Sequence, residues 1–201
     1  MLRVGLTGGF ASGKSFVGQT LLSLGCHLLK ADELGHAVLS PGGEAHQDVI
    51  DAFGWEIVQE DGSIDRRALA RLVFDRPDLL ERLNNLVHPH VIDREERWMH
   101  EVQARDPHGI AVVEAAILIE TGSYRRFDRI ILAFCRPEQQ LERAMKRDQL
   151  SRDEVAQRLR RQMSLEEKRK YADFVVDTSG NKEQTVEQVR AVHAALRSLE
   201  L

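Results

Sequence analysis

Residues 8–15 read Gly8-Gly9-Phe10-Ala11-Ser12-Gly13-Lys14-Ser15. This stretch matches the phosphate-binding loop (P-loop) pattern G-x-x-x-x-G-K-S at every fixed position. Glycine tolerates the dihedrals that let a chain wrap round a phosphate with its N–H groups pointing inward. Lys14 brings a compact positive charge to the β- and γ-phosphates of a nucleotide, and the hydroxyl of Ser15 is a ligand for Mg²⁺.

The segments on either side of the loop have the context that the motif requires. Before it, Leu2, Val4 and Leu6 lie in a short run typical of a strand. After it, apolar residues at helical spacing predict a helix over about residues 13–24, with Gly25 as its stop. A second buried strand is expected over residues 26–29.

Further buried strands are indicated at residues 110–119, 129–135 and 174–176 by apolar, partly β-branched runs. Such runs suit strands that are covered on both faces, as in a parallel sheet. Charged helical sequence follows over residues 137–170, and an amphipathic helix over 182–199. Strands that alternate with helices predict an α/β fold with a doubly wound, parallel, five-stranded sheet.

Residues 41–108 have a different pattern, because glycines and Pro77 divide them into short pieces. Helices are predicted over residues 66–74 and 78–87, with a further helix after Pro89. The segment is longer than a plain crossover requires, so we interpret it as a helical insertion. With 201 residues the chain is expected to be a single domain. Its expected parts are a core (1–40, 109–136 and 172–201), the insertion (about 41–108) and a charged segment (about 137–171).

Charge and composition exclude several function classes. The net charge of −4 argues against a general nucleic-acid binder, and 5% aromatic residues argue against a base-stacking platform. The longest apolar run, residues 110–119, is shorter than the ~20 residues that span a bilayer. Cys26 and Cys135 form no C-x-x-C pair, which suits buried thiols in a reducing cytoplasm. No secretory signal is apparent, so we expect a cytoplasmic protein without nucleic-acid or membrane partners.

Short blocks along the rest of the chain match a known family in order and spacing. The blocks are Gly5-Leu6-Thr7-Gly8-Gly9, Ser12-Gly13-Lys14-Ser15, Ala31-Asp32, Arg66-Arg67-Ala68-Leu69, His88-Pro89, Leu118-Ile119-Glu120, Gln140-Leu141-x-Arg143, Arg147-Asp148, Gln162-Met163 and Ala172-Asp173. Together they resemble the dephospho-coenzyme A kinases over almost the full length. The resemblance implies a monomeric P-loop kinase that uses ATP and Mg²⁺. Its reaction would phosphorylate the ribose 3′-hydroxyl of dephospho-CoA, the last step of coenzyme A biosynthesis.

The resemblance also implies roles for individual residues. Residues 41–108 become the acceptor-binding insertion, and residues 137–171 become a lid. The expected catalytic residues are Asp32, Lys14 and Arg143. The expected ATP-binding residues are Gly9, Phe10, Ala11, Ser12, Gly13, Lys14, Ser15, Phe16, Arg143 and Arg147, with Ser15 as the Mg²⁺ ligand. The expected acceptor-binding residues are Asp32, Arg66, Arg67, His88, Leu118 and Glu120.

Asp32 follows the second predicted strand, at the edge where ligands of open α/β sheets bind. A carboxylate there can accept the proton of the acceptor hydroxyl or hold Mg²⁺ through water. The alternative is that Asp32 caps the following helix, and the two roles are compatible.

The predicted lid is strongly basic. Residues 143–170 carry ten basic side chains, including Arg161, against five acidic ones. Arginine forks match phosphate oxygens, so a basic flap suits a polyphosphate ligand, with Arg143 and Arg147 nearest the nucleotide. For any one of the other arginines, a solvated helix face is the more common role.

Other candidates have open alternatives. His88 is either a substrate contact or a packed histidine at a helix end. Arg66 and Arg67 either contact the acceptor's pyrophosphate or flank a helix start. Glu120 either reaches metal-bound water or the lid, or is a plain surface acid. Glu114 lies where related ATPases carry a metal-site acid, but it could instead pair with a buried base.

The chain departs from the family pattern at five positions. Ala11 replaces a glycine, which is tolerable if its φ is negative, and Phe16 replaces a threonine. Lys30 replaces an acid, Ala116 a proline and Thr178 an asparagine. None of these changes removes Lys14 or Ser15.

Three alternatives remain at this point. The first is a P-loop kinase for another small acceptor, such as a nucleoside monophosphate. The second is a GTP-binding switch, because Asp32-Glu33-Leu34-Gly35 fits D-x-x-G and Asn181-Lys182 resembles a guanine-reading motif. Gln184 stands where the guanine-binding aspartate would be, which argues against it. The third is a P-loop scaffold that acts on nucleic acid.

Overall fold

The computed structural model describes residues 1–74, 76–160 and 162–199. The chain forms two compact units. The first unit comprises Met1–Lys30 and the chain from Met99 onward, and the second comprises Ala31–Trp98. Within the described ranges, no helix is both long enough and apolar enough to cross a membrane.

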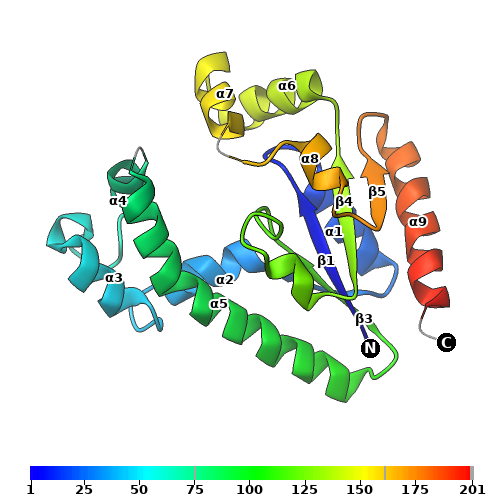
Figure 1. The fold of residues 1–201 in the computed structure, drawn as a ribbon, viewed down its shortest axis with the longest axis horizontal. Coiled ribbons are helices and arrows are strands. Elements are labelled where there is room, and N and C mark those ends of the chain that lie inside the picture. Colours follow the sequence, from blue (N-terminus) through cyan, green and yellow to red (C-terminus); the bar gives the residue numbers. More distant parts are fainter. Residues whose placement is uncertain (75, 161, 200–201) are drawn as a thin grey trace. The chain divides into compact units, whose positions relative to one another are not determined.

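The first unit is built on a sheet of five parallel strands (Figure 1). The strands are β1 (Leu2–Gly8), β2 (His27–Lys30), β3 (Ile110–Glu114), β4 (Arg129–Phe134) and β5 (Phe174–Asp177). Their order in the sheet is β2-β3-β1-β4-β5. The predicted α/β class and five-stranded parallel sheet are confirmed. In this order β1 is central, so the loop that follows it lies at the middle of the sheet's carboxyl edge, where ligands of such folds bind.

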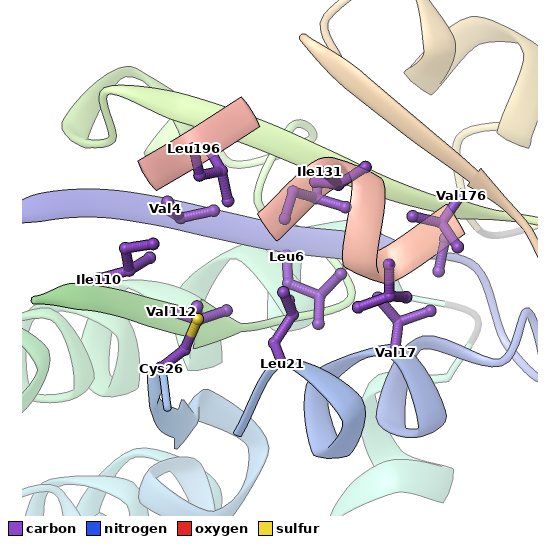
Figure 2. Close-up of a cluster of buried hydrophobic side chains, with 13 residues drawn as sticks. Val4, Leu6, Val17, Leu21, Cys26, Ile110, Val112, Ile131, Val176 and Leu196 are labelled. Atoms are coloured by element: carbon purple, nitrogen blue, oxygen red, sulfur yellow. The ribbon is translucent and has the colours of Figure 1, made fainter. Parts of the chain in front are cut away.

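One face of the sheet is covered by α1 (Lys14–Ser23) and α9 (Lys182–Ser198). Figure 2 shows Val17 and Leu21 of α1 directed toward Leu6 of β1, with Leu196 of α9 in the same cluster. These four side chains are fully buried. Burying one such side chain stabilises the fold by roughly 1.5–3 kcal/mol, so this cluster fixes α1 and therefore the loop that precedes it.

The opposite face of the sheet packs closely against the segment between β3 and β4. A Cβ atom on Gly5 would lie only 2.7 Å from Cδ1 of Ile130 and 3.0 Å from Cδ1 of Leu118. Both neighbours are buried, as is Leu165 beside Leu132 further along this unit's core. Glycine at position 5 therefore lets the chain after β3 approach the central strand.

Strand β3 is shorter than predicted. It ends at Glu114, whereas the sequence predicted a strand to residue 119. Residues 116–121 form turns, yet Leu118 and Ile119 remain buried. An apolar run of this kind is equally compatible with a buried turn, so periodicity could not locate the end of the strand. A short 3₁₀ helix, η2 (Ser123–Arg126), follows.

The predicted charged helical stretch is three helices. They are α6 (Pro137–Asp148), α7 (Arg152–Arg160) and α8 (Leu165–Arg169). Gln149 ends α6 with a positive φ of 54°. Ser164 begins α8 with a capping box to Glu167, a standard helix-start signal. Arg161, one of the ten predicted lid cations, lies outside the described residues.

The second unit is helical. It contains α2 (Ala31–Val38), α3 (His46–Phe53), the 3₁₀ helix η1 (Trp55–Ile57), α4 (Arg66–Val73) and the first part of α5 (Pro77–Arg105). Its own core includes Val38, Ile50, Phe53, Ile57 and Leu69. The helix predicted at 66–74 is confirmed, and Asp65 caps it by accepting from the N–H groups of Arg67 and Ala68.

Helix α5 does not stop before Pro89, which corrects the prediction of two helices there. Proline inside a helix costs about 3 kcal/mol because it removes a hydrogen bond and crowds the preceding turn. Val87 and Val91 lie one turn apart on either side of it, and both pack into the core of the second unit. This shared burial explains how the helix continues through the proline.

Candidate active site

The P-loop lies between a strand and a helix, as its sequence predicts. Gly8 ends β1 opposite Ala133 of β4, and α1 begins at Lys14. Gly13 has φ of 86°, a left-handed conformation that glycine adopts without steric cost. The first N–H groups of α1 have no partner within the helix and point out of its positive end, which makes them a site for an anion.

Ala11 is strained where a glycine would not be. Its φ is 57°, so the condition under which alanine is tolerable here, a negative φ, is not met. For a residue with a Cβ atom the left-handed conformation costs roughly 1–2 kcal/mol. The P-loop holds this conformation despite that cost.

Glu114 binds two functional groups of the P-loop through one oxygen. The Nζ atom of Lys14 lies 2.9 Å from its Oε1, and the Oγ atom of Ser15 lies 2.7 Å from the same oxygen. The Glu114 side chain keeps only 4% of its accessibility and that of Lys14 keeps 11%. The structure thus shows Glu114 paired with a base, Lys14, whereas its role as a metal-site acid stays a prediction.

These residues also fit a magnesium ion. Mg²⁺ prefers oxygen ligands and is usually held by one or two carboxylates together with substrate phosphates and waters. Here the Ser15 hydroxyl touches the Glu114 carboxylate, whose second oxygen, Oε2, is buried without a hydrogen-bond partner. Among the described residues there is no group of three or more His, Cys, Asp or Glu side chains that could hold a metal ion without phosphate.

Phe10 joins the P-loop to the charged helical segment that was predicted to be a lid. Its N–H donates to Oε1 of Gln162 at 2.8 Å, and its carbonyl accepts from Nε2 of Gln140 at 2.7 Å. The guanidinium groups of Arg147 and Arg158 lie 4.9 and 5.5 Å from the centre of its ring. Two arginines of the predicted lid segment are therefore held at the P-loop by cation–π contacts, each contributing about 0.5–1 kcal/mol.

Arg143 reaches the P-loop through Thr178. Its guanidinium donates to Oγ1 of Thr178 at 3.0 Å and to the Thr178 carbonyl at 2.6 Å. The same hydroxyl donates to the carbonyl of Ser12 at 2.8 Å. Thr178 is 4% exposed, and a Cβ atom on Gly13 would lie 3.0 Å from its Oγ1. Thr178 thus connects Arg143 to the P-loop backbone.

Arg147 is paired as well. Its Nε and Nη2 atoms donate to the two carboxylate oxygens of Asp148 at 2.9 and 3.0 Å. This fork geometry raises the pKa of Arg147 and lowers that of Asp148. A polyphosphate would have to replace Asp148 in order to use the same fork.

The second unit contains a cavity of about 750 Å³. Its lining includes Arg66 and Arg67 from the start of α4, together with His36, Gln59 and Asp65. Two arginines in a hollow of this volume are suited to a phosphate-bearing ligand of coenzyme size.

Residues 2–184 match the family model for dephospho-CoA kinase. The chain is 41% identical over 189 residues to the dephospho-CoA kinase of Carboxydothermus hydrogenoformans, which covers 94% of this chain and 91% of that relative. It is likewise 41% identical over 192 residues to the enzyme of the same name from Geobacter metallireducens, covering 96% and 95% of the two chains. The chain belongs to the dephospho-CoA kinase family.

A crystal structure of a Thermus thermophilus protein supports the same fold for this dephospho-CoA kinase family member. It has a TM-score of 0.81 at 35% identity and covers 96% of this chain and 97% of that one. The family identifies the chain as an ATP-dependent kinase. A GTP-binding switch is not supported. Asn181, which was considered as part of a guanine-reading motif, caps α9 in a reciprocal capping box with Gln184.

Of the other acceptor residues predicted from the resemblance, Asp32 and His88 also lie in the second unit, and Leu118 lies in the core of the first. Asp32 is exposed in the first turn of α2, two residues after Lys30, which pairs with Glu114 in the sheet. His88 lies inside α5 rather than at a helix end, and burial lowers its pKa. Leu118 is 3% exposed and packs beside Gly5. Their contacts with the acceptor stay predictions.

Glu120 contacts two residues of the segment that was predicted to be a lid. Its Oε1 atom lies 2.9 Å from Nζ of Lys168 and accepts from the N–H of Met163 at 3.2 Å. Phe16, the other P-loop departure, has the ammonium of Lys182 5.8 Å from the centre of its ring. Cys26 and Cys135 are both buried thiols, and burial raises the pKa of the Cys135 thiol.

Sequence reasoning missed the roles of three residues in this candidate site. It gave no role to Gln140 and Gln162, although both stood in blocks that carried the resemblance. It treated Lys168 only as one cation of the lid, whereas this side chain is fully buried. The available sequence signal for this burial was weak: Lys168 lies one helical turn after the apolar Leu165, at the start of a short helix.

Proposed function

We propose that the chain transfers the γ-phosphoryl group of ATP to the ribose 3′-hydroxyl of dephospho-CoA. The observation that carries the proposal is the P-loop with Lys14, Ser15 and Glu114 in contact, in a chain of this family. The cavity beside Arg66 and Arg67 supports an acceptor that carries phosphates. The monomeric state, which the resemblance implies, and the cytoplasmic location, which the cysteine usage suggests, stay predictions.

The donor half of the reaction uses positioning and charge, which dominate phosphoryl transfer. The N–H groups at the start of α1 bind the phosphate oxygens, and Lys14 exchanges Glu114 for the β- and γ-phosphates. Ser15 and Glu114 would hold Mg²⁺, which supplies charge neutralisation when it is bound. Arg143, fixed by Thr178, and Arg147, released from Asp148, offer forks to the transferring group.

The acceptor half places the hydroxyl and removes its proton. Asp32 accepts the proton of the ribose 3′-hydroxyl as that oxygen attacks the γ-phosphorus. A positioned general base of this kind contributes about 10²–10⁴-fold to the rate. Arg66 and Arg67 bind the pyrophosphate of dephospho-CoA in the second unit's cavity. Closure of the lid excludes water, which would otherwise accept the phosphoryl group.

The test compares acceptors directly. Formation of ADP is measured with dephospho-CoA and, separately, with nucleoside monophosphates, each with Mg²⁺ and ATP. The expected result is a kcat/KM for dephospho-CoA at least a hundredfold above that for any nucleoside monophosphate. Magnesium-dependent ATP binding without transfer to dephospho-CoA would refute the acceptor assignment and leave the nucleotide site intact.

A further inference from the structure

Lys168 is a fully buried lysine on α8 that the reaction as described does not use. Its Nζ atom donates to the Ala116 carbonyl at 2.5 Å and lies 2.9 Å from Oε1 of Glu120. Burying an ammonium costs several kcal/mol, and a well-packed apolar side chain in place of a buried ion pair is often no less stable. Fold stability alone therefore does not account for a charge at this position.

The carbonyl that Lys168 holds lies beside the phosphate site. Ala116 is two residues after Glu114, the carboxylate that binds Lys14 and Ser15. The same Ala116 oxygen accepts from the hydroxyl of Thr7 at 3.3 Å. Thr7 is fully buried and immediately precedes the first glycine of the P-loop. One ammonium thus fixes the chain that leaves β3 against the residue that leads into the P-loop.

The surrounding contacts tie the same chain segment to the base of the lid. Glu120 also accepts from the N–H of Met163, and the rings of Tyr124 and Tyr171 meet edge to face at 5.2 Å. Burial is the main cause that lowers the pKa of Lys168. The positive charge of Lys14 in the P-loop also lowers it.

We propose that Lys168 is a positioning residue for phosphoryl transfer. Its hydrogen bond to Ala116 fixes the backbone at the end of β3 and, with it, the direction of the Glu114 carboxylate. Because Lys168 lies on α8, this contact also links the lid to that carboxylate. This inference takes the reaction from the proposed function. The contacts on which it depends, however, lie at the nucleotide site and do not involve the acceptor.

Two variants separate this role from a structural one. Lys168→Met keeps the length of the side chain and removes the ammonium. Lys168→Met combined with Glu120→Gln removes both charges, so that no carboxylate is left unpaired. Lys170→Met is the matched control, since it makes the same change two positions away on an exposed residue.

Four quantities are measured for each protein: the free energy of unfolding, kcat, KM for dephospho-CoA, and the dissociation constant of ADP with and without Mg²⁺. Mg²⁺ should increase the affinity for ADP. We expect this increase to be at least fivefold smaller in both Lys168 variants than in the wild type. We also expect kcat to fall at least tenfold in both variants, with KM for dephospho-CoA changed less than threefold in Lys168→Met, which leaves Glu120 in place. The Lys170 control should stay within twofold of the wild type throughout.

A merely structural lysine gives a different pattern. In that case the double variant would recover stability, kcat and the Mg²⁺-dependent gain together, and the proposal would be overturned. If Lys168→Met alone fails to fold, the double variant carries the same test. ADP binding does not involve the acceptor, so a wild-type protein that is inactive on dephospho-CoA would refute the proposed function and leave this inference testable.

Discussion

Glu114 restrains Lys14 and Ser15 with a single oxygen atom, at 2.9 and 2.7 Å. In the proposed mechanism, a nucleotide takes both groups from this carboxylate as it binds. Hydrogen bonds to charged groups contribute about 1.5–3 kcal/mol each. In Glu114→Gln an acceptor oxygen remains but its charge is lost, so about half of one such contribution disappears from the ligand-free state. A change of about 1.4 kcal/mol corresponds to a tenfold change in affinity.

We therefore expect Glu114→Gln to bind ATP about tenfold more tightly than the wild type when Mg²⁺ is removed with a chelator. With Mg²⁺ present, the same variant should lose at least 100-fold in kcat, because the carboxylate of the metal site is gone. Calorimetric titration measures the affinities, and a coupled assay for ADP measures the rates. Glu166→Gln, the same change on an exposed residue of α8, is the control.

The affinity without metal is the decisive number. If Glu114→Gln folds and binds metal-free ATP no more tightly than the wild type, then Glu114 does not compete with phosphate for Lys14. A variant that keeps wild-type kcat would in addition remove Glu114 from the metal site. Neither result would depend on which acceptor the enzyme uses.

Three further predictions concern other parts of the chain. Asp32→Asn should lower kcat by about 10²–10⁴-fold with little change in the free energy of unfolding, and near-normal turnover would exclude Asp32 as the base. Ala11→Gly should raise the free energy of unfolding by about 0.5–1 kcal/mol, since relief of the left-handed strain exceeds the cost of a freer unfolded chain; urea unfolding would show a loss if this is wrong. The Arg94 guanidinium lowers the pKa of Glu44 to about 2 from its ordinary 4.5, so this pair stabilises the fold above pH 4.5 and is lost as pH falls toward 2. Glu44→Gln should therefore cost stability at pH 6 and cost progressively less toward pH 2, whereas an equal cost at both pH values in denaturant unfolding would contradict the assignment.

The features that followed from local sequence were predicted correctly. The P-loop is specified by short-range requirements, such as the left-handed Gly13, and by the buried strand and amphipathic helix around it. The parallel sheet followed from apolar runs such as that at residues 129–135, which became β4. The start of the predicted helix at 66–74 is also determined locally, because Asp65 directly precedes this helix and caps it.

The errors came from contacts between residues far apart in the chain. Pro89 should end a helix by local rules, but burial of Val87 and Val91 on either side keeps α5 continuous. The end of β3 at Glu114 depends on how the following turn packs over Gly5. The partners of Glu114 are about a hundred residues away, so no local pattern could have chosen between its two possible roles.

The division of the chain into two units has a practical consequence for spectroscopy. Both tryptophans, Trp55 and Trp98, belong to the unit that spans Ala31–Trp98, and Trp55 is 72% exposed. Both tyrosines, Tyr124 and Tyr171, belong to the other unit and are in contact with each other. Indole fluorescence will thus report on the helical unit without any label, and a tryptophan placed at Tyr171 would add an optical signal for the half that carries the P-loop.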